Sequence, residues 1–128
     1  KLFLFGELIG ITFQIRDDLF DYSENKIGKP IGIDIKDKKM TLPLIHVINT
    51  ASVNERNWIL NTIKKHNNDK TKVKELISFV KEKGGVEYAK KVMLKYKSKA
   101  LKMILEFPKS DFRQSLEFML DYVIERKY

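Results

Sequence analysis

The sequence of 128 residues has no cysteine, few prolines and glycines, and no long uninterrupted apolar run. The lack of cysteine excludes a disulfide framework, a cysteine-ligated zinc site and a thiol nucleophile, and it favours a reducing, cytoplasmic setting. Polar or charged residues interrupt each apolar stretch below transmembrane length, so we expect no transmembrane segment. The opening residues 1–10 include Glu7 and have no small-residue cleavage site, and we therefore expect no signal peptide.

The formal net charge of +8 would suit a nucleic-acid partner, but its distribution favours another interpretation. Residues 1–50 hold equal numbers of basic and acidic side chains, so the whole excess lies in residues 51–128. Lysine far outnumbers arginine, and the sequence has no recognised groove-reading motif. A basic helical module for nucleic acid is therefore the weakest functional alternative. We expect no nucleic acid among the partners and assign the excess charge to solvated helix faces.

Helical periodicity runs through nearly all of the sequence without a strand pattern, which predicts an all-α fold. Residues 2–22 predict a helix that is apolar on most sides, of the kind buried in the middle of a helical protein. The segment 23–39 carries glycines, a proline and many charges, and it predicts a long loop. Further helices are expected from the N-cap Thr41 to residue 51, from the capping box Ser52–Glu55 through residue 63, from Asn68 or Asp69 to Gly84, over 86–106, and from Ser110 onward. The inward face of the last helix is expected to consist of Phe112, Leu116, Met119, Leu120, Val123 and Ile124.

Three aspartates and a glutamine near the end of the first helix are the strongest candidates for chemistry. In the segment F-Q-I-R-D-D-L-F-D, spacings of three and four residues place on one helical face Gln14, Asp17, Asp18 and Asp21. Like charges on one face beside apolar neighbours are destabilising unless a cation neutralises them. Oxygen ligands of this kind suit Mg²⁺, which binds one or two carboxylates and keeps its other positions for water and phosphate oxygens.

The segment after this helix supplies basic groups, because Lys29 and Lys39 lie on either side of Asp34. Lysine binds phosphate as a point charge, and the flexible glycines of this segment allow the backbone to close over an anion. Each signal alone has an ordinary interpretation, as a solvated acidic helix face or as surface lysines. Because the two signals lie close together in the sequence, they predict a bipartite site for a diphosphate and its metal.

The segments that carry these residues resemble the trans-isoprenyl diphosphate synthases, the polyprenyl synthetase family. Residues 13–22, F-Q-I-R-D-D-L-F-D-Y, resemble the second aspartate-rich motif of the family, and residues 28–45 resemble the segment that follows it. G-G-V-E-Y-A at 84–89, F-P at 107–108 and V-I-E-R-K at 123–127 extend the resemblance over the whole chain. It implies that residues 1–128 are the C-terminal part of a single polyprenyl synthetase domain, with the motif at 13–22, a diphosphate-binding loop at 23–39 and a helical region at 40–128.

This resemblance implies the C-terminal portion of a helical bundle of the isoprenoid (terpenoid) synthase type, homodimeric at full length. The implied activity is that of a Mg²⁺-dependent prenyltransferase, which condenses an allylic diphosphate with isopentenyl diphosphate head to tail in isoprenoid biosynthesis. The resemblance implies that Asp17 binds the metal directly and that Asp18 and Asp21 bind it directly or through water. Lys29 and Lys39 are implied to contact the allylic diphosphate. Phe13 and Gln14 are implied to line the cavity.

The family's first aspartate-rich motif is missing from this sequence, and residues 46–128 contain no second Asp-Asp-x-x-Asp. The first helix also begins at residue 1 without an N-cap signal. We therefore expect a fragment that carries one wall of the metal site and is inactive alone. Arg16 is a smaller departure, because it puts a charge beside the carboxylates. The alternative is a non-catalytic subunit of a heteromeric prenyl diphosphate synthase, which the intact aspartates and Lys29 argue against.

Overall fold

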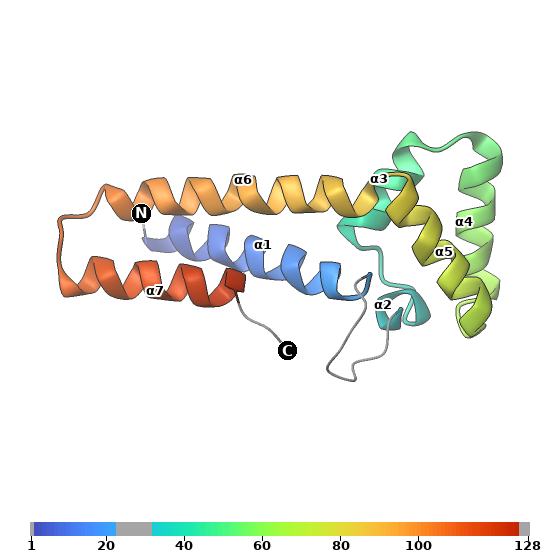
Figure 1. Ribbon diagram of the computed structural model, residues 1–128, viewed down its shortest axis with the longest axis horizontal. Coiled ribbons are helices and arrows are strands. Elements are labelled where there is room, and N and C mark those ends of the chain that lie inside the picture. The colour runs from blue at the N-terminus through green and yellow to red at the C-terminus, as the bar shows by residue number, and fades with distance from the viewer. Residues whose placement is uncertain (1, 23–31, 126–128) are drawn as a thin grey trace. The chain divides into compact units, whose positions relative to one another are not determined.

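The computed structural model of the chain describes residues 2–22 and 32–125, with side chains through Tyr122. These residues form helices without strands, which confirms the predicted all-α class (Figure 1). The helices are α1 (Leu2–Phe20), α2 (Ile33–Lys36), α3 (Leu42–Thr50), α4 (Val53–Lys65), α5 (Lys70–Glu82), α6 (Gly85–Leu105) and α7 (Asp111–Glu125). Within the described ranges, no helix combines the length and the apolar character needed to cross a membrane.

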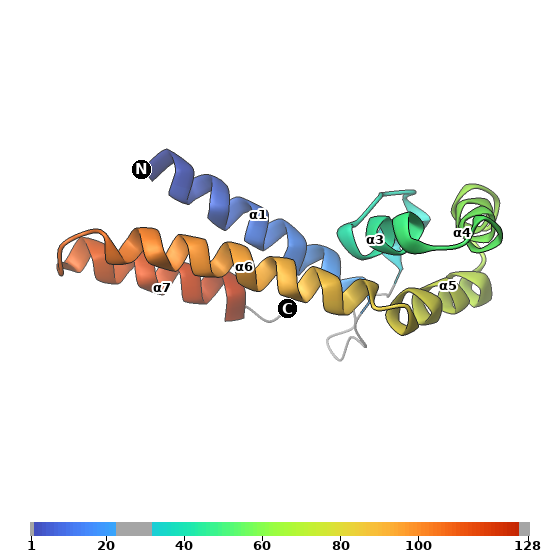
Figure 2. The ribbon, with the colours of Figure 1, turned by 90° about the horizontal axis from the view of Figure 1, so that it is seen from above.

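The chain divides into two compact units, which we call the terminal unit (residues 1–16 and 90–128) and the central unit (residues 17–89). The terminal unit contains most of α1, most of α6, and α7. In it, α6 and α7 run antiparallel and are joined by a turn (Figure 2). The three helices bury a shared apolar core made of Phe5, Leu8, Ala100, Ile104, Leu116 and Leu120.

Within this chain, α1 is less buried than the sequence predicts. Phe5 and Leu8 enter the core of the terminal unit, but Leu2, Phe3 and Ile11 are exposed, Phe3 by 81%. The reason is geometric, because α6 and α7 cover only one side of a helix that is apolar on several. The inward face of α7 is also narrower than predicted. Leu116 and Leu120 are buried, Phe112 and Met119 are exposed, and the side chains of Val123 and Ile124 lie outside the described ones.

The central unit is built from α3, α4 and α5, which pack against one another (Figures 1 and 2). Its core contains side chains from each of these helices, from the short α2, and from Tyr22, which follows α1. The buried members are Tyr22, Ile35, Leu44, Val47, Ile59, Ile63, Val73, Leu76, Ile77 and Val80. Burial of this many large apolar side chains, each contributing about 1.5–3 kcal/mol before entropy is subtracted, accounts for a compact unit of this size.

The starts of α4 and α5 follow the predicted capping signals. The Glu55 backbone N–H donates to the Ser52 hydroxyl over 3.2 Å, and the Ser52 N–H donates to the Glu55 carboxylate over 3.0 Å. Asp69, one of the two predicted starts, accepts the backbone N–H groups of Thr71 and Lys72. These side chains satisfy N–H groups that have no partner inside a helix, so the local sequence determines where both helices begin.

The predicted loop at 23–39 contains a helical turn that the sequence analysis missed. Gly32 has a φ of 85°, in the left-handed region that glycine adopts most readily, and α2 begins immediately after it. Ile35 is completely buried and anchors this turn in the core of the central unit. A helix of four residues is too short to show a helical period, so only its tertiary contact reveals it. Residues 23–31 lie outside the described part of the chain.

Candidate functional site

The three predicted metal-binding aspartates lie at the C-terminal end of α1. Asp17 and Asp18 belong to the last turn of the helix, and Asp21 follows its final residue, Phe20. The chain turns tightly there, because the Asp21 N–H donates to the Asp18 carbonyl and the Tyr22 N–H donates to the Leu19 carbonyl. Asp18 and Asp21 are buried and Asp17 is half-buried, so these acids are not the freely solvated face of the ordinary interpretation.

Asp21 uses one carboxylate oxygen to hold the returning chain. Its Oδ1 accepts the Asp34 backbone N–H over 3.2 Å, and its backbone carbonyl accepts the Gly32 N–H over 3.3 Å. Its Oδ2 is buried and has no hydrogen-bond partner among the described residues. Burial raises the pKa of Asp21, against a smaller lowering by the Asp34 N–H, and the nearby charge of Asp34 raises it further. A buried carboxylate with an unsatisfied oxygen is a group that a bound cation would stabilise.

Lys39, the described member of the predicted lysine pair, reaches the carboxylates. Its Nζ lies 3.3 Å from Asp18 Oδ1, and its backbone N–H donates to the Asp34 carbonyl over 2.7 Å. Desolvation lowers the pKa of Lys39. The hydrogen bond to Asp18 and the charges of Asp18, Asp34 and Asp17 together outweigh desolvation, so the pKa lies above its ordinary value. The lysine is therefore a cation held at the edge of the acidic cluster.

Tyr22 and Thr41 form a second link between the end of α1 and the segment that carries Lys39. The Tyr22 hydroxyl and Thr41 Oγ1 share a hydrogen bond of 3.1 Å, and both side chains are 1% exposed. Burial raises the pKa of the Tyr22 phenol, against a smaller lowering by this bond, so the phenol stays protonated. The structure corrects the role predicted for Thr41. It occupies the N-cap position of α3, but its side chain makes no capping hydrogen bond.

The remaining predicted site residues lie outside the described part of the central unit. Phe13 is half-buried and Gln14 is exposed, and both lie on the part of α1 that belongs to the terminal unit. Lys29 lies outside the described residues. Within 2–22 and 32–125, no group of three or more carboxylate or imidazole side chains is arranged to hold a metal ion. The predicted carboxylates are thus not a preformed metal site among these residues, although Asp21 offers a hard cation one oxygen that has no hydrogen-bond partner there.

Sequence reasoning gave no role to Tyr22 and noted Asp34 only for its position between the lysines. The signal for Tyr22 was available, since a tyrosine directly after a carboxylate motif must find a partner for its hydroxyl if it is buried. Asp34 holds Asp21 and Lys39 through its backbone N–H and carbonyl. Those groups are common to every residue type, so no feature of the sequence could have identified these two contacts.

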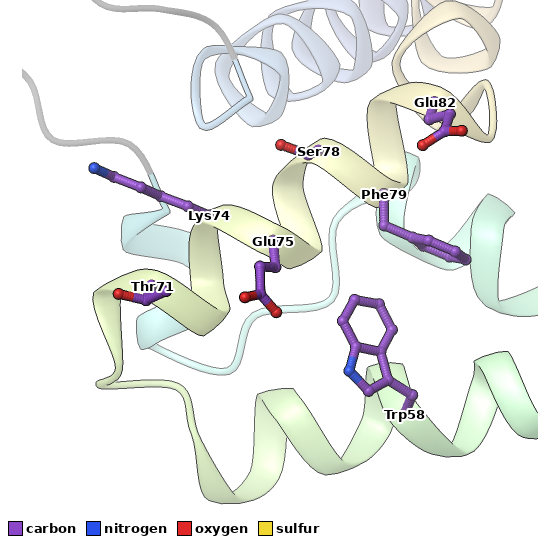
Figure 3. A pocket seen from close by; sticks show the side chains of 7 residues that line it. All are labelled: Trp58, Thr71, Lys74, Glu75, Ser78, Phe79 and Glu82. Atoms are coloured by element: carbon purple, nitrogen blue, oxygen red, sulfur yellow. The ribbon is translucent and has the colours of Figure 1, made fainter.

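A surface hollow of about 480 Å³ lies between α4 and α5. The Trp58 and Phe79 rings meet there edge to face, with centroids 5.2 Å apart (Figure 3). It is open to solvent, and none of the described site candidates lines it. The lining residues are Trp58, Thr71, Lys74, Glu75, Ser78, Phe79 and Glu82. The hollow therefore adds nothing to the carboxylate site.

Comparison with known proteins shows which family this chain is similar to. A family profile described as polyprenyl synthetase matches residues 1–80. A short chain isoprenyl diphosphate synthase of Methanothermobacter thermautotrophicus is 33% identical over 97% of this chain and 38% of its own length. Heptaprenyl diphosphate synthase component 2 of Bacillus subtilis is 28% identical over 99% of this chain and 36% of its own length. The chain thus spans less than two fifths of the length of these curated relatives.

A solved structure agrees with these relatives. The crystal structure of geranylgeranyl pyrophosphate synthase from Bacteroides thetaiotaomicron superposes with a TM-score of 0.85 at 40% identity. The alignment covers 96% of this chain and 41% of that one. The helical architecture of the chain is therefore that of the solved isoprenoid synthase structures over nearly its whole length.

Proposed function

The chain belongs to the polyprenyl synthetase family, and from this premise we propose that it carries one wall of the active site of a prenyltransferase. The full-length protein would condense an allylic diphosphate with isopentenyl diphosphate, head to tail, and would require Mg²⁺. The observation that carries the proposal is the meeting of two segments far apart in the sequence. Lys39 contacts Asp18, and one buried oxygen of Asp21 has no hydrogen-bond partner among the described residues.

The donor set suits Mg²⁺ bound together with a diphosphate. Mg²⁺ needs only one or two carboxylates from the protein, since water and phosphate oxygens complete its shell. Asp17 is half-buried and would bind the metal directly, and Asp18 and Asp21 would bind it directly or through water. The chemistry that Mg²⁺ supplies when bound is neutralisation of the charge that develops on the departing diphosphate.

Lys39 would bind the phosphate oxygens that remain. Its ammonium group is 3.3 Å from Asp18, so a diphosphate that arrives with its metal finds a cation already at the edge of the carboxylates. Lys29 has the same proposed role, and Phe13 and Gln14 would line the cavity beside the reacting ends. An apolar lining keeps water from the reacting carbon after the diphosphate departs.

The proposal includes a homodimer, which the family resemblance implies, and a cytoplasmic location, which the lack of cysteine favours. A second candidate is a subunit of a heteromeric synthase. It is favoured by one relative, which is named as component 2 of a heptaprenyl diphosphate synthase. The two are separated by purifying the full-length protein alone, because a homodimeric synthase condenses the substrates without a second polypeptide.

The test is the rate at which the full-length protein incorporates labelled isopentenyl diphosphate, with and without Mg²⁺. We expect condensation that chelation abolishes. Asp17→Ala should lower kcat by about a hundredfold or more, because stabilisation of the leaving group is lost in the transition state. Asp121→Ala, at an exposed position of α7, is the matched control and should leave the rate unchanged. Wild-type turnover of Asp17→Ala at saturating Mg²⁺ would remove Asp17 from the site.

A further inference from the structure

We propose that the buried hydroxyl pair of Tyr22 and Thr41 is a positioning device that sets Lys39 at the correct distance from the carboxylates for diphosphate binding. The inference rests on the proposed function, because it assumes that Lys39 binds the diphosphate. Tyr22 directly follows the last aspartate of the motif, and Thr41 lies two residues after Lys39. Their hydrogen bond therefore joins the acidic and basic halves of the site directly.

The Thr41 hydroxyl does not make the capping hydrogen bond that is usual for a threonine at the start of a helix. Thr41 has the extended backbone of an N-cap, with φ −93° and ψ 162°, yet its side chain makes no capping bond to α3. A threonine in that position normally stabilises its helix through such a bond. Here its Oγ1 is bonded to the Tyr22 hydroxyl, 3.1 Å away. The link to α1 is thus formed in place of a cap.

Two consecutive residues, Asp21 and Tyr22, hold the two ends of the segment 32–41. Asp21 holds its beginning, through the N–H groups of Gly32 and Asp34, and Tyr22 holds its end, through Thr41. Lys39 lies close to the second attachment, so any slack there would move its ammonium group away from Asp18. Both members of the Tyr22–Thr41 bond are buried, and loss of one would leave the other unsatisfied.

The backbone is strained immediately before Lys39, at Lys38. Lys38 has a φ of 58°, in the left-handed region that residues with a side chain adopt rarely. Its N–H donates to the Ile35 carbonyl, and the Lys39 N–H donates to the Asp34 carbonyl, which closes the turn. A strained residue of this kind persists only where its surroundings hold it in place. The Tyr22–Thr41 bond supplies that restraint on the side toward α3.

The experiment measures the steady-state kinetics of the full-length protein with Tyr22→Phe and Thr41→Val, each of which removes one hydroxyl and keeps the shape. We expect KM for the allylic diphosphate to rise about tenfold, the equivalent of one lost hydrogen bond, with KM for isopentenyl diphosphate unchanged. The Kd of Mg²⁺ with inorganic diphosphate, measured by calorimetry, should rise by a similar factor. Thr41→Ser keeps the hydroxyl and should restore both values.

Two controls separate positioning from general destabilisation. Thr62 is equally buried and bonds the Trp58 carbonyl within α4, so Thr62→Val removes a comparable hydroxyl and should leave both constants unchanged. In a Lys39→Ala background, Tyr22→Phe should have no further effect, because its influence passes through Lys39. An unchanged KM in Tyr22→Phe, or an equal rise in the Lys39→Ala background, would overturn the inference.

Failure of the proposed function would give different results from failure of the positioning role. If the wild-type full-length protein does not condense the two diphosphates, the prenyltransferase proposal fails and the positioning role fails with it. If the wild type is active and Lys39→Ala weakens diphosphate binding, the proposed function stands. The response of Tyr22→Phe then decides the positioning role alone.

Discussion

At the scale of single residues, the two carboxylate oxygens of Asp21 have different roles. Oδ1 accepts the Asp34 N–H and so organises the chain, while Oδ2 is buried without a hydrogen-bond partner among the described residues. Burial raises the pKa of this carboxyl, which means that its ionised form destabilises the fold unless a cation is present. The hydrogen bond of Asp21 thus organises the chain, and its charge would serve metal binding under the proposed function.

Asp21→Asn separates these two roles, because an amide oxygen can still accept the Asp34 N–H while the charge is lost. We expect the Mg²⁺ concentration for half-maximal rate in the full-length protein to rise about tenfold to a hundredfold. Without metal, the free energy of unfolding at neutral pH should not fall, since a buried charge has been removed. The measurements are a Mg²⁺ titration of the rate and urea unfolding in chelator. A large loss of stability with an unchanged Mg²⁺ requirement would make Asp21 purely structural.

At the scale of elements, the helices differ in what determines them. Local caps set the starts of α4 and α5, and the sequence was sufficient to place them. The turn α2 depends on Ile35 being buried in the core, and no local pattern predicts it. The start of α3 was predicted at the right residue for the wrong reason, because the Thr41 side chain bonds Tyr22 instead of capping the helix.

Close packing at the start of α6 leads to a prediction about Gly85. A Cβ at this position would lie 2.6 Å from the Pro43 carbonyl oxygen and 2.8 Å from side-chain atoms of Val47 and Val80. Gly85→Ala should therefore destabilise the 128-residue chain by about 1–3 kcal/mol in urea unfolding, through overpacking. Gly10→Ala is the matched control, because no described atom lies within 4 Å of its Cβ, and it should stabilise α1 by about 0.5–1 kcal/mol. Equal effects of the two substitutions would contradict this account.

The capping box of α4 predicts a pH dependence. The backbone N–H of Ser52 lowers the pKa of Glu55 below its ordinary value, and Lys83, 3.5 Å from its carboxylate, lowers it further. A carboxyl group with a lowered pKa in the folded state stabilises the fold above its unfolded pKa of about 4.5, and this contribution is lost as pH falls through the lowered value. The stability difference between wild type and Glu55→Gln should therefore shrink as pH falls from about 4.5 through the lowered value. A difference that is constant between pH 7 and pH 3 would contradict the role of the charge.

At the scale of the whole molecule, the chain divides into two units that contain different predicted site residues. The central unit contains Lys39 and the three aspartates of the motif, Asp17, Asp18 and Asp21. The terminal unit contains Phe13, Gln14 and a set of exposed apolar side chains on α1 and α7. The lysines of α4 and α5 are exposed on the surface, as expected for solvated helix faces.

The 128-residue chain should be catalytically inactive by itself. It has one aspartate-rich motif and spans less than two fifths of the length of its relatives, so only one wall of the proposed site is available. We expect no incorporation of labelled isopentenyl diphosphate by the purified chain under conditions in which the full-length protein is active. Measurable condensation by the 128 residues alone would show that the second wall is not required.

The sequence by itself determined the all-α class, most helix starts, the family and the identity of the acidic and basic residues. Helical periods, caps and the spacing of three and four residues are local properties, so they can be read without a fold. Only the tertiary structure decided that Lys39 lies against Asp18, that Asp21 holds the backbone of Asp34, and that Thr41 bonds Tyr22. Those contacts join residues between 13 and 21 positions apart. Their geometry depends on the packing of Ile35 and Tyr22 into one core, which no local pattern contains.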